Sequence, residues 1–529
     1  MTFRSLTFGL ILMLGGTFSA GSGFAIGPSI VIVAGTPVQG QPGFAYALPS
    51  GAVFSRDGMI VYSAGGTIFE GDASRLTVRH RRGSHLAGIP LDLGVAADSN
   101  HIAANDSGDI AFGGWMMGSA GTTGYALFAS SASGELSSVF RANDPAPGLP
   151  VGTRFGSDVY DLVIDGTGGL VTRAPLLETP SEFLTTVSVW FRRNYGPLQL
   201  LVKQGQIPPG APAPIAELSA SYLNRVGEIA VLGTDSTGAK LILVADATGP
   251  LRTLIREGDA NPAGLTGAKL RAICCGTYSR TISWSASGVA FAARLEVGFG
   301  GVDPTNDSVI LASNGSGGLR VVAREGDPIP GQPGFVWGQL NSAAVNDPGQ
   351  IAIFQAYTFY HKELVLFDPV AGPIVVVKTG QPAPGFPPGA TMGVDGDDDS
   401  NLPFALSNSG ALAFQASVSP LVDPFGLNMV ARFVRTPSGV LSRVAGPGDV
   451  VEIAPGVDRM IYDMSIGSLD ESGNMLLDLY RYDPISSFSL GMATAIYSTP
   501  EPSATTMVSI GAMLLGLFAC RSSPSRRPH

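Results

Sequence analysis

A unit of roughly 60 residues recurs along this chain of 529 residues and constrains its fold more than any other feature. Regular self-similarity of this kind marks repeat proteins, in which each unit buries its apolar faces against its neighbours. The chain is therefore expected to form one array of similar modules. One glycine marks each of eight copies, at intervals of 50, 60, 59, 61, 61, 61 and 63 residues: Gly58, Gly108, Gly168, Gly227, Gly288, Gly349, Gly410 and Gly473.

Each marking glycine lies in a polar segment that leads into an apolar run. The clearest copies are 105–112 (NDSGDIAF) and 346–353 (NDPGQIAI), whereas the copy at 284–291 (WSASGVAF) has its glycine displaced by one position. Asn, Asp and Ser start turns by bonding their own backbone, and glycine accepts the positive φ that such turns need. The motif thus predicts a turn that enters a buried strand. A ligand role for Asn105, Asn224 and Asn346 is the alternative.

A proline-rich turn is the second landmark, with its clearest copy at 326–331 (GDPIPG). Proline lacks an N–H donor, so this segment must be a loop or a sheet edge. Apolar runs of strand length flank these landmarks, as at 319–324, 351–353 and 364–367, and a weaker run lies at 335–345. Each unit therefore offers four short strands.

Four antiparallel strands in each of eight units predict an all-β fold, a β-propeller of about eight four-stranded blades. Seven blades, or a β-solenoid, are the alternatives. Closure of a propeller ring would bring residues 30–33 (IVIV) beside the last strand, at 492–497. The repeat domain is expected to span residues 26–497.

The two ends of the chain look like processing segments. Arg4, an apolar run from Leu6 to Gly16 and small residues up to Ala25 have the pattern of a signal peptide, residues 1–25, with cleavage expected after Ala25. Near the other end, Pro500, Glu501 and Pro502 precede an apolar run and a basic tail. That run is barely long enough to anchor the chain permanently in a membrane. A permanent C-terminal anchor helix is the alternative interpretation. The tail contains Arg521, Arg526 and Arg527.

Residues 498–529 resemble the bacterial PEP-CTERM sorting signal, which has a Pro-Glu-Pro motif, a hydrophobic helix and an arginine-rich end. The repeats at residues 30 to 497 resemble the choice-of-anchor tandem repeats of the N-x-x-G-x-x-A-F type. These resemblances imply an exosortase-type processing enzyme as a partner, transient association with the inner membrane, and delivery to the cell surface or extracellular matrix. They supply no catalytic residues to transfer to this chain.

The charge of the chain excludes one large class of partner. The formal net charge is −10, and a nucleic-acid-binding protein needs a basic face. Three cysteines are too few for a disulfide-built fold. The adjacent Cys274 and Cys275 are expected to be small half-buried side chains, with a strained vicinal disulfide as the alternative.

The best metal candidate is the acidic segment 395–401 (DGDDDSN). Asp395, Asp397 and Asp399 place oxygens at alternate positions, as calcium requires, although the segment lacks the glycine and glutamate of an EF-hand loop. A solvated acidic insertion is the alternative. His80 and His85 are five residues apart, which would send them to opposite faces of a strand and spoil a metal pair. No other cofactor is expected.

Two functions fit this sequence. The first is a structural or ligand-binding role without catalysis, with exopolysaccharide, another glycan or a surface protein as the ligand. The second is an extracellular carbohydrate-active enzyme that uses carboxylates in the propeller funnel. A cluster of at least two acids and an aromatic residue on one central face would distinguish them. The recurring acids Asp259, Asp327 and Asp449 are expected to cap turns, because Gln206 and Gln381 replace them in other units.

Overall fold

The computed structural model describes most of the repeat region. The described ranges are 29–33, 50–55, 59–71, 76–119, 121–131, 133–178, 186–246, 249–273, 282–313, 317–358, 361–394, 404–422, 428–447, 449–454, 457–461, 463–470, 474–482 and 489–497. Within them the strands form eight antiparallel sheets of four or five strands and one two-stranded hairpin. Among these residues, no helix is long and apolar enough to cross a membrane.

The first four sheets follow one another along the chain. The first contains β2 (Ser50–Phe54), β3 (Ile60–Ala64), β4 (Thr67–Gly71) and β5 (Leu76–His80). The second contains β6 (Gly94–Ala104), β7 (Ile110–Gly118), β8 (Gly121–Ser130) and β9 (Leu136–Arg141). The third contains β10 (Arg154–Phe155), β11 (Leu162–Ile164), β12 (Leu170–Leu177), β13 (Thr186–Arg192) and β14 (Gln199–Lys203). The fourth contains β15 (Ile215–Leu223), β16 (Ile229–Asp235), β17 (Lys240–Ala245) and β18 (Arg252–Arg256).

The next three sheets repeat this plan. A 3-10 turn, η2 (Pro262–Gly264), precedes the fifth sheet, which contains β19 (Leu270–Ile273), β20 (Ser283–Ser285), β21 (Gly288–Leu295), β22 (Ser308–Ser313) and β23 (Leu319–Arg324). The sixth contains β24 (Gln339–Val345), β25 (Ile351–Thr358), β26 (His361–Asp368) and β27 (Gly372–Lys378). The seventh contains β28 (Thr391–Gly393), β29 (Phe404–Leu406), β30 (Leu412–Val422), β31 (Asn428–Arg435) and β32 (Leu441–Ala445).

The eighth sheet combines both ends of the described chain. After the hairpin of β33 (Val450–Ala454) and β34 (Val457–Met460), it takes β35 (Asp463–Leu469), β36 (Met475–Tyr482) and β37 (Ser489–Tyr497), and its fourth strand is β1 (Ser29–Val33). Strands β1 and β37 are antiparallel, with Ser29 opposite Ile496 and Val33 opposite Ala493. The expected closure of the ring by residues 30–33 is therefore confirmed.

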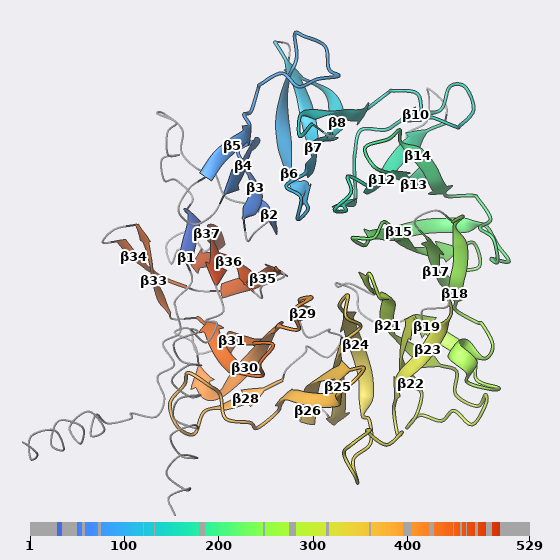
Figure 1. Ribbon diagram of the computed structural model, residues 1–529, viewed down its shortest axis with the longest axis vertical. Coiled ribbons are helices and arrows are strands. Elements are labelled where there is room, and N and C mark those ends of the chain that lie inside the picture. Colours follow the sequence, from blue (N-terminus) through green and yellow to red (C-terminus); the bar gives the residue numbers. More distant parts are fainter. Residues whose placement is uncertain are drawn as a thin grey trace, which may run out of the picture.

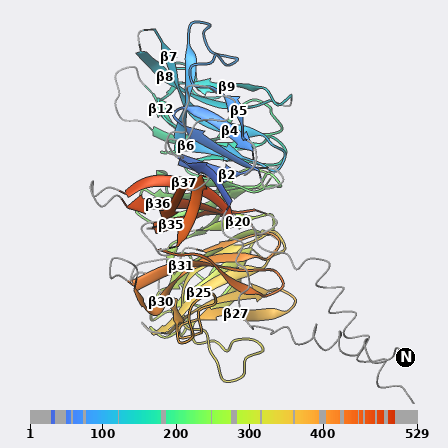
Figure 2. The ribbon, with the colours of Figure 1, turned by 90° about the vertical axis from the view of Figure 1, so that its left-hand side faces the viewer.

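The eight sheets are arranged in a ring around a central axis (Figure 1). Seen from the side they lie in one layer, with the eighth sheet between the first and the seventh (Figure 2). This arrangement is a β-propeller of eight blades, not a β-solenoid, and it confirms the fold predicted from the repeats. The first strand of each blade lies nearest the axis, and the later strands follow outwards (Figure 1).

The apolar core lies between neighbouring blades. Because each blade is covered on both faces, its middle strands are apolar at nearly every position; in β17, five consecutive residues from Leu241 are buried. Between the first and second blades, Phe112 stacks on Phe128 at 5.2 Å. Between the second and third, Phe140 stacks on Phe155 at 4.1 Å.

Several innermost strands are interrupted half-way along their length. In β6 the pairing with β7 shifts between Ala97 and Ile102, and in the third blade residues 156–161 separate β10 from β11, although both pair with β12. β15 and β24 carry smaller shifts at Leu218 and Leu340. Such interruptions turn side chains out of the ladder, here beside the axis of the ring.

Candidate functional site

The turns that join the first and second strands of the blades are linked to one another around the axis. Asn105 Oδ1 accepts the backbone N–H groups of Ser107 at 3.0 Å and Asp109 at 2.9 Å, which closes the expected turn. Its Nδ2 donates to Asp109 Oδ2 at 3.0 Å and to the carbonyl oxygen of Asp165, in the next blade, at 2.5 Å. The turn interpretation is confirmed, and the same amide also joins two blades.

The other two motif asparagines repeat this arrangement. Asn224 Nδ2 donates to the carbonyl oxygen of Ser285 at 2.8 Å, and Asn346 Nδ2 donates to that of Ser407 at 2.9 Å. All three asparagines are at least 90% buried. These contacts use the polar atoms that the alternative ligand role would need. Six marking glycines have positive φ, from 76° to 103°: Gly108, Gly168, Gly227, Gly288, Gly349 and Gly410.

The remaining motif copies are placed less uniformly. Gly58 and Gly473 lie outside the described residues. In the fifth blade, where the glycine of the motif is displaced, Ser285 pairs directly with Gly288, so this turn is one residue shorter. Ser285 takes the place of the asparagine there, and its Oγ donates to the carbonyl oxygen of Asn346 at 3.0 Å.

The interrupted inner strands of the second, third and fourth blades bring together acids and aromatic rings. In β6, Asp98 Oδ2 lies 3.3 Å from His101 Nδ1. The hydroxyl of Tyr125, on β8, lies 3.2 Å from the same imidazole nitrogen and 3.4 Å from Asp98 Oδ2. Burial raises the pKa of Tyr125, and the nearby carboxylates of Asp98 and Asp158 raise it further. Tyr125 therefore stays protonated and acts as a donor.

Tyr125 reaches the inner strand because a glycine makes room for it. A Cβ on Gly113 would lie 1.9 Å from the Tyr125 hydroxyl oxygen, so any larger residue on this part of β7 would displace the ring. Trp115, two residues further along β7, packs edge-on against Tyr125 at 4.9 Å and keeps 41% of its surface exposed. An exposed indole held rigidly by a buried ring is a typical stacking platform for a ligand.

The third blade continues this surface towards the fourth. Tyr160 is 39% exposed, and the Arg173 guanidinium lies 5.5 Å from its ring centre. Arg173 forms an ion pair with Asp161 and donates to the carbonyl oxygen of Leu218 in the fourth blade. Burial raises the pKa of Tyr160, and so does Asp158, against the opposing effect of Arg173. Asp158 thus lies near both Tyr125 and Tyr160.

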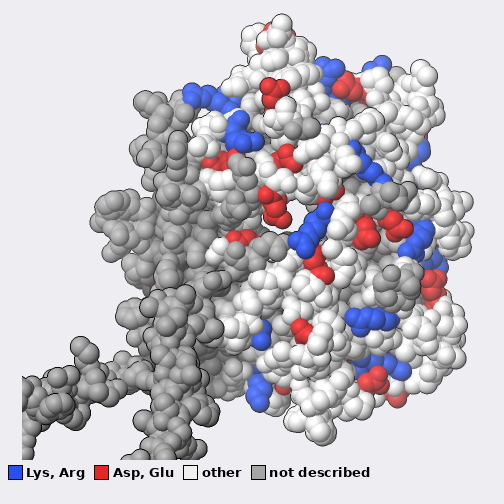
Figure 3. Space-filling model, in the orientation of Figure 1, with Lys and Arg blue, Asp and Glu red and all other residues white. Residues whose placement is uncertain are grey.

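We call this surface the inner belt. It offers two exposed rings for stacking and carboxylates that accept hydrogen bonds from a ligand. In the view of Figure 3, one face of the ring is hollowed near its centre, and acidic and basic side chains surround the hollow. The inner belt comprises Asp98, His101, Trp115, Tyr125, Asp158, Tyr160, Asp161, Arg173 and Ser221.

The model of one protein family, described as "Family of unknown function (DUF7453)", matches residues 45–273 and 277–362. This is more than half of the chain. The chain belongs to this family. The match includes every residue of the inner belt, so the belt lies inside the family's own module. No match was found among curated protein sequences.

Solved structures resemble this DUF7453 chain only distantly. A fucose-specific lectin from Aleuria aurantia is 12% identical, with 63% of this chain and 92% of the lectin covered and a TM-score of 0.23. A periplasmic gluconolactonase from Pseudomonas aeruginosa is 14% identical, with 78% and 98% covered and a TM-score of 0.30. The tricorn protease is 12% identical, with 92% and 51% covered and a TM-score of 0.22. Similarity at this level supports no inference about ligands.

His80 and His85 each bond to a backbone carbonyl oxygen. His80 is buried, with Nε2 3.0 Å from the carbonyl oxygen of Val95 and its ring stacked on Phe112 at 5.6 Å. His85 Nε2 lies 3.1 Å from the carbonyl oxygen of Ile89. In the described part of the chain, no group of three or more His, Cys, Asp or Glu side chains is placed to hold a metal ion.

Several predicted features lie outside the described residues. They are the calcium candidates Asp395, Asp397 and Asp399, the pair Cys274 and Cys275, the leader at 1–25 and the sorting segment at 498–529. In sequence, the calcium candidates fall between β28 and β29, and the cysteines fall between β19 and β20.

Two of the three recurring acids, Asp259 and Asp449, cap turns as expected. Asp259 Oδ2 accepts the N–H of Arg256 at 2.8 Å, and Asp449 Oδ2 accepts that of Gly446 at 2.8 Å. Gln206 Oε1 occupies the same position in another unit, where it accepts the N–H of Lys203 at 3.3 Å. The carboxylates of Asp259 and Asp449 are therefore used within their own turns.

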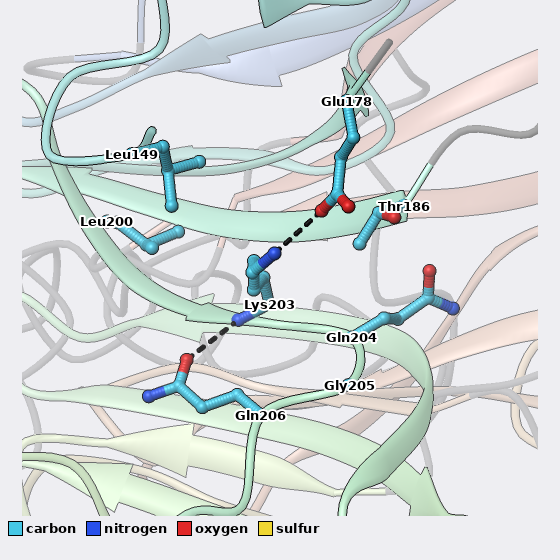
Figure 4. A pocket seen from close by; sticks show the side chains of 8 residues that line it. All are labelled: Leu149, Glu178, Thr186, Leu200, Lys203, Gln204, Gly205 and Gln206. Atoms are coloured by element: carbon cyan, nitrogen blue, oxygen red, sulfur yellow. Dashed lines mark hydrogen bonds and ion pairs between the residues drawn. The ribbon is translucent and has the colours of Figure 1, made fainter. Parts of the chain in front are cut away.

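A second concavity lies on the outside of the third blade (Figure 4). It has a volume of about 670 Å³, and Leu149 and Leu200 form its apolar side. Lys203 Nζ points across it to Glu178 Oε1 at 2.6 Å, so its two opposite charges neutralise each other. The inner belt, where carboxylates outnumber guanidiniums, is the stronger candidate.

Sequence reasoning missed the inner belt. Its members come from three repeat units and from positions that do not recur, so repeat alignment hides them. The one sequence signal for it is the length between the proline turn and the glycine motif, which is greater in the second unit than in the fourth or sixth.

Proposed function

We propose that this protein is an exported propeller that binds carbohydrate at the inner belt without transforming it. The observation that carries the proposal is that two exposed aromatic rings each lie beside a carboxylate: Trp115 packs on Tyr125, which is bonded to Asp98, and Tyr160 lies beside the Arg173–Asp161 ion pair. A pyranose ring presents an apolar C–H face that packs on an aromatic ring, and hydroxyl groups that donate to carboxylates.

The site is also rigid, which favours binding. Tyr125 holds Trp115 from one side, and it is itself fixed by the space above Gly113. Arg173 and Asp161 brace Tyr160 and join the third blade to the fourth, where Ser221 donates to Asp161 from both its N–H and its hydroxyl, at 2.8 and 3.2 Å. Groups that need no reordering lose little entropy when a ligand binds.

The expected leader and sorting segment would place this binding outside the cytoplasm. Processing at both ends, with an exosortase-type enzyme at Pro500-Glu501-Pro502, would deliver the propeller to the cell surface or extracellular matrix. Exopolysaccharide is the carbohydrate available there, and binding it would hold the protein in the matrix.

Catalysis is the second candidate, and one observation favours it. Asp98 Oδ2 lies 3.4 Å from the hydroxyl of Tyr125, and Asp158 also raises the pKa of that hydroxyl, so two carboxylates act on one aromatic residue. Glycoside hydrolases use such a pair, one as acid and the other as base or nucleophile.

A glycan array probed with the full-length protein, followed by assay of reducing ends, tests both candidates. Binding without release of reducing ends supports the proposal, and turnover supports the enzyme. Trp115→Ala should lower affinity at least tenfold. Phe335→Ala, which removes a ring 60% exposed on a proline turn of another blade, should not. Equal affinity of both variants and the parent would refute binding at the belt.

A further inference from the structure

We propose that β1 is a docking edge for a second copy of this chain, so that the eighth blades of two propellers join in one continuous sheet. β1 (Ser29–Val33) is the outermost strand of the eighth blade. Among the described strands it is hydrogen-bonded only to β37, so its other edge presents backbone N–H and C=O groups with which a further strand can pair. Assembly of this kind does not depend on carbohydrate binding.

The first seven blades protect the same edge with charge. A basic residue on an outermost strand discourages pairing with another strand, because pairing would take its charge out of water. Each of these seven outermost strands contains at least one basic residue: Arg79 in β5, Arg141 in β9, Lys203 in β14, Arg256 in β18, Arg324 in β23, Lys378 in β27 and Arg443 in β32. β1 has the sequence SIVIV and contains no charged residue. The eighth blade therefore lacks the protection that the other blades have.

Comparison of the repeats identifies the position at which the charge is lost. Residues 35–44 (GTPVQGQPGF) match residues 326–335 (GDPIPGQPGF), and this match places Val33 where Arg324 stands. The same position before the proline turn is basic in four further units: Arg141, Lys203, Arg256 and Lys378. No Asp, Glu, Lys, Arg or His occurs between Ser5 and Ser55, so no neighbour in sequence replaces the missing charge.

The sequence of β1 makes a second copy the partner that fits. Two identical strands pair antiparallel about a two-fold axis, and such an interface closes with two copies. Pairing β1 with itself buries no charge from either strand, and it extends the antiparallel ladder that β1 already forms with β37. Pro28 lacks the N–H that would continue this ladder, so the pairing is confined to a short strand and the dimer should dissociate on dilution.

The hairpin of β33 and β34 flanks this edge (Figure 1). β33 lies beside β1, but among the described strands it pairs only with β34. The hairpin therefore approaches β1 without completing its ladder.

A dimer of this kind would carry two inner belts. The third and fourth blades, which supply Tyr160 and Ser221 to the belt, lie across the ring from the eighth blade (Figure 1). Joining two eighth blades therefore leaves both belts at the outer sides of the dimer. Two linked sites bind a long polysaccharide more tightly than one, because the second contact is intramolecular. This consequence, unlike the dimer itself, rests on the proposed function.

Sedimentation velocity of the full-length protein, without glycan, tests the dimer. A mild detergent in the buffer keeps the apolar segments at the two ends of the chain from associating. We expect a shift from monomer to dimer between about 1 µM and about 100 µM, the range in which so small an interface dissociates. Hydrogen exchange at residues 29–33 should slow over the same range, because β1 gains a second partner strand.

Two variants restore charge to the edge. Val33→Arg introduces the residue that stands at this position in β23, and Ser29→Lys adds a charge at the other end of β1. Each should raise the dissociation constant of the dimer at least about tenfold. Ile374→Arg is the matched control, because it adds the same charge to β27, an outermost strand on which Ile374 is 37% exposed. It should leave the dissociation constant unchanged. Melting temperatures equal to that of the parent would show that the ring is still closed in each variant.

The outcomes decide between the possible occupants of the edge. A monomer at every concentration would overturn the proposal, and slow exchange at 29–33 in that monomer would mean that another part of the same chain covers β1. A dimer that neither Val33→Arg nor Ser29→Lys weakens would place the interface elsewhere, and so would equal weakening by Ile374→Arg. Since no glycan is present, none of these results bears on carbohydrate binding, which the glycan array tests separately.

Discussion

Arg225 Nε pairs with Asp347 Oδ2, although the two residues belong to the fourth and sixth blades. The pair passes over the turn of the fifth blade, where the N–H of Ala286 donates to Asp347 Oδ1 at 2.6 Å. From the seventh blade, Asn408 Nδ2 donates to Asp347 Oδ2 at 2.8 Å. One carboxylate therefore ties together the turns of four successive blades.

The buried acceptor should matter more here than the ion pair. The Arg225 side chain is 51% exposed, and exposed pairs contribute at most about 1 kcal/mol. The Asp347 side chain is only 9% exposed, and its loss leaves the N–H of Ala286 and the amide of Asn408 without their acceptor. Asp347→Ala should lower the free energy of unfolding by about 2–3 kcal/mol, and Arg225→Ala by less than about 1 kcal/mol.

Urea unfolding followed by circular dichroism measures both changes. Asp106→Ala is the matched control, because Asp106 follows Asn105 as Asp347 follows Asn346, but is exposed. Its unfolding curve should overlay that of the parent. A cost for Asp347→Ala no larger than that for Asp106→Ala would mean that the four turns are held together by other contacts.

The motif asparagines allow the turn and the link between blades to be separated. Asn346→Asp keeps the Oδ1 acceptor for the N–H of Gln350 at 2.8 Å, but replaces the donor to Ser407 and to Gln350 Oε1 with a carboxylate oxygen that faces both acceptors. Asn346→Ala removes the acceptor and the donor. We expect a loss of about 1–2 kcal/mol for Asn346→Ala and a larger loss for Asn346→Asp, because the new carboxylate is almost fully buried, measured by the same unfolding assay. If Asn346→Asp were as stable as the parent, the bond between blades would contribute nothing.

Strand order and the ring were predictable because they depend on local chemistry that repeats. The run at 364–367 lies within β26, and the weak run at 335–345 contains β24, since alternating apolar residues and glycine turns fix each strand in place. The link from Asn105 to Asp165 was not predictable, because turn chemistry alone explains the asparagine. Its bond to the next blade depends on the distance between neighbouring turns in the ring.

The inner belt was unpredictable for a related reason. Asp98 and His101 interrupt β6, but the residues on both sides of the interruption have the composition of one strand. Trp115 and Tyr160 are 45 residues apart in sequence and read as ordinary strand aromatics. They come together because of the register of β7 with β8 and the position of the third blade. Neither can be predicted from a single segment of the sequence.

Ring closure by β1 leads to a prediction about truncation. A chain that begins at Ile30 loses one of the four residue pairs between β1 and β37, whereas a chain that begins at Ala34 loses all of them. The first should melt like the parent, and the second should melt at least a few degrees lower, since the edge of β37 is then unpaired. Scanning calorimetry measures this. Equal melting temperatures would show that β1 does not hold the ring closed.

His80 predicts how stability depends on pH. Burial lowers the pKa of this imidazole below its ordinary value of 6.5, against the opposing effect of the hydrogen bond to Val95. As the pH falls through the ordinary pKa, the unfolded chain takes up a proton more readily than the folded one. The contribution of His80 to stability is therefore fully present above that pKa and is lost below it. His80→Leu should remove this loss while leaving the Val95 carbonyl oxygen bonded to the N–H of Gly83 at 2.7 Å. The free energy of unfolding, measured with urea from about pH 8 to pH 5, should therefore change equally with pH in parent and variant near pH 8. Towards pH 5 it should fall more steeply in the parent. An equally steep decline in both would place the titrating group elsewhere.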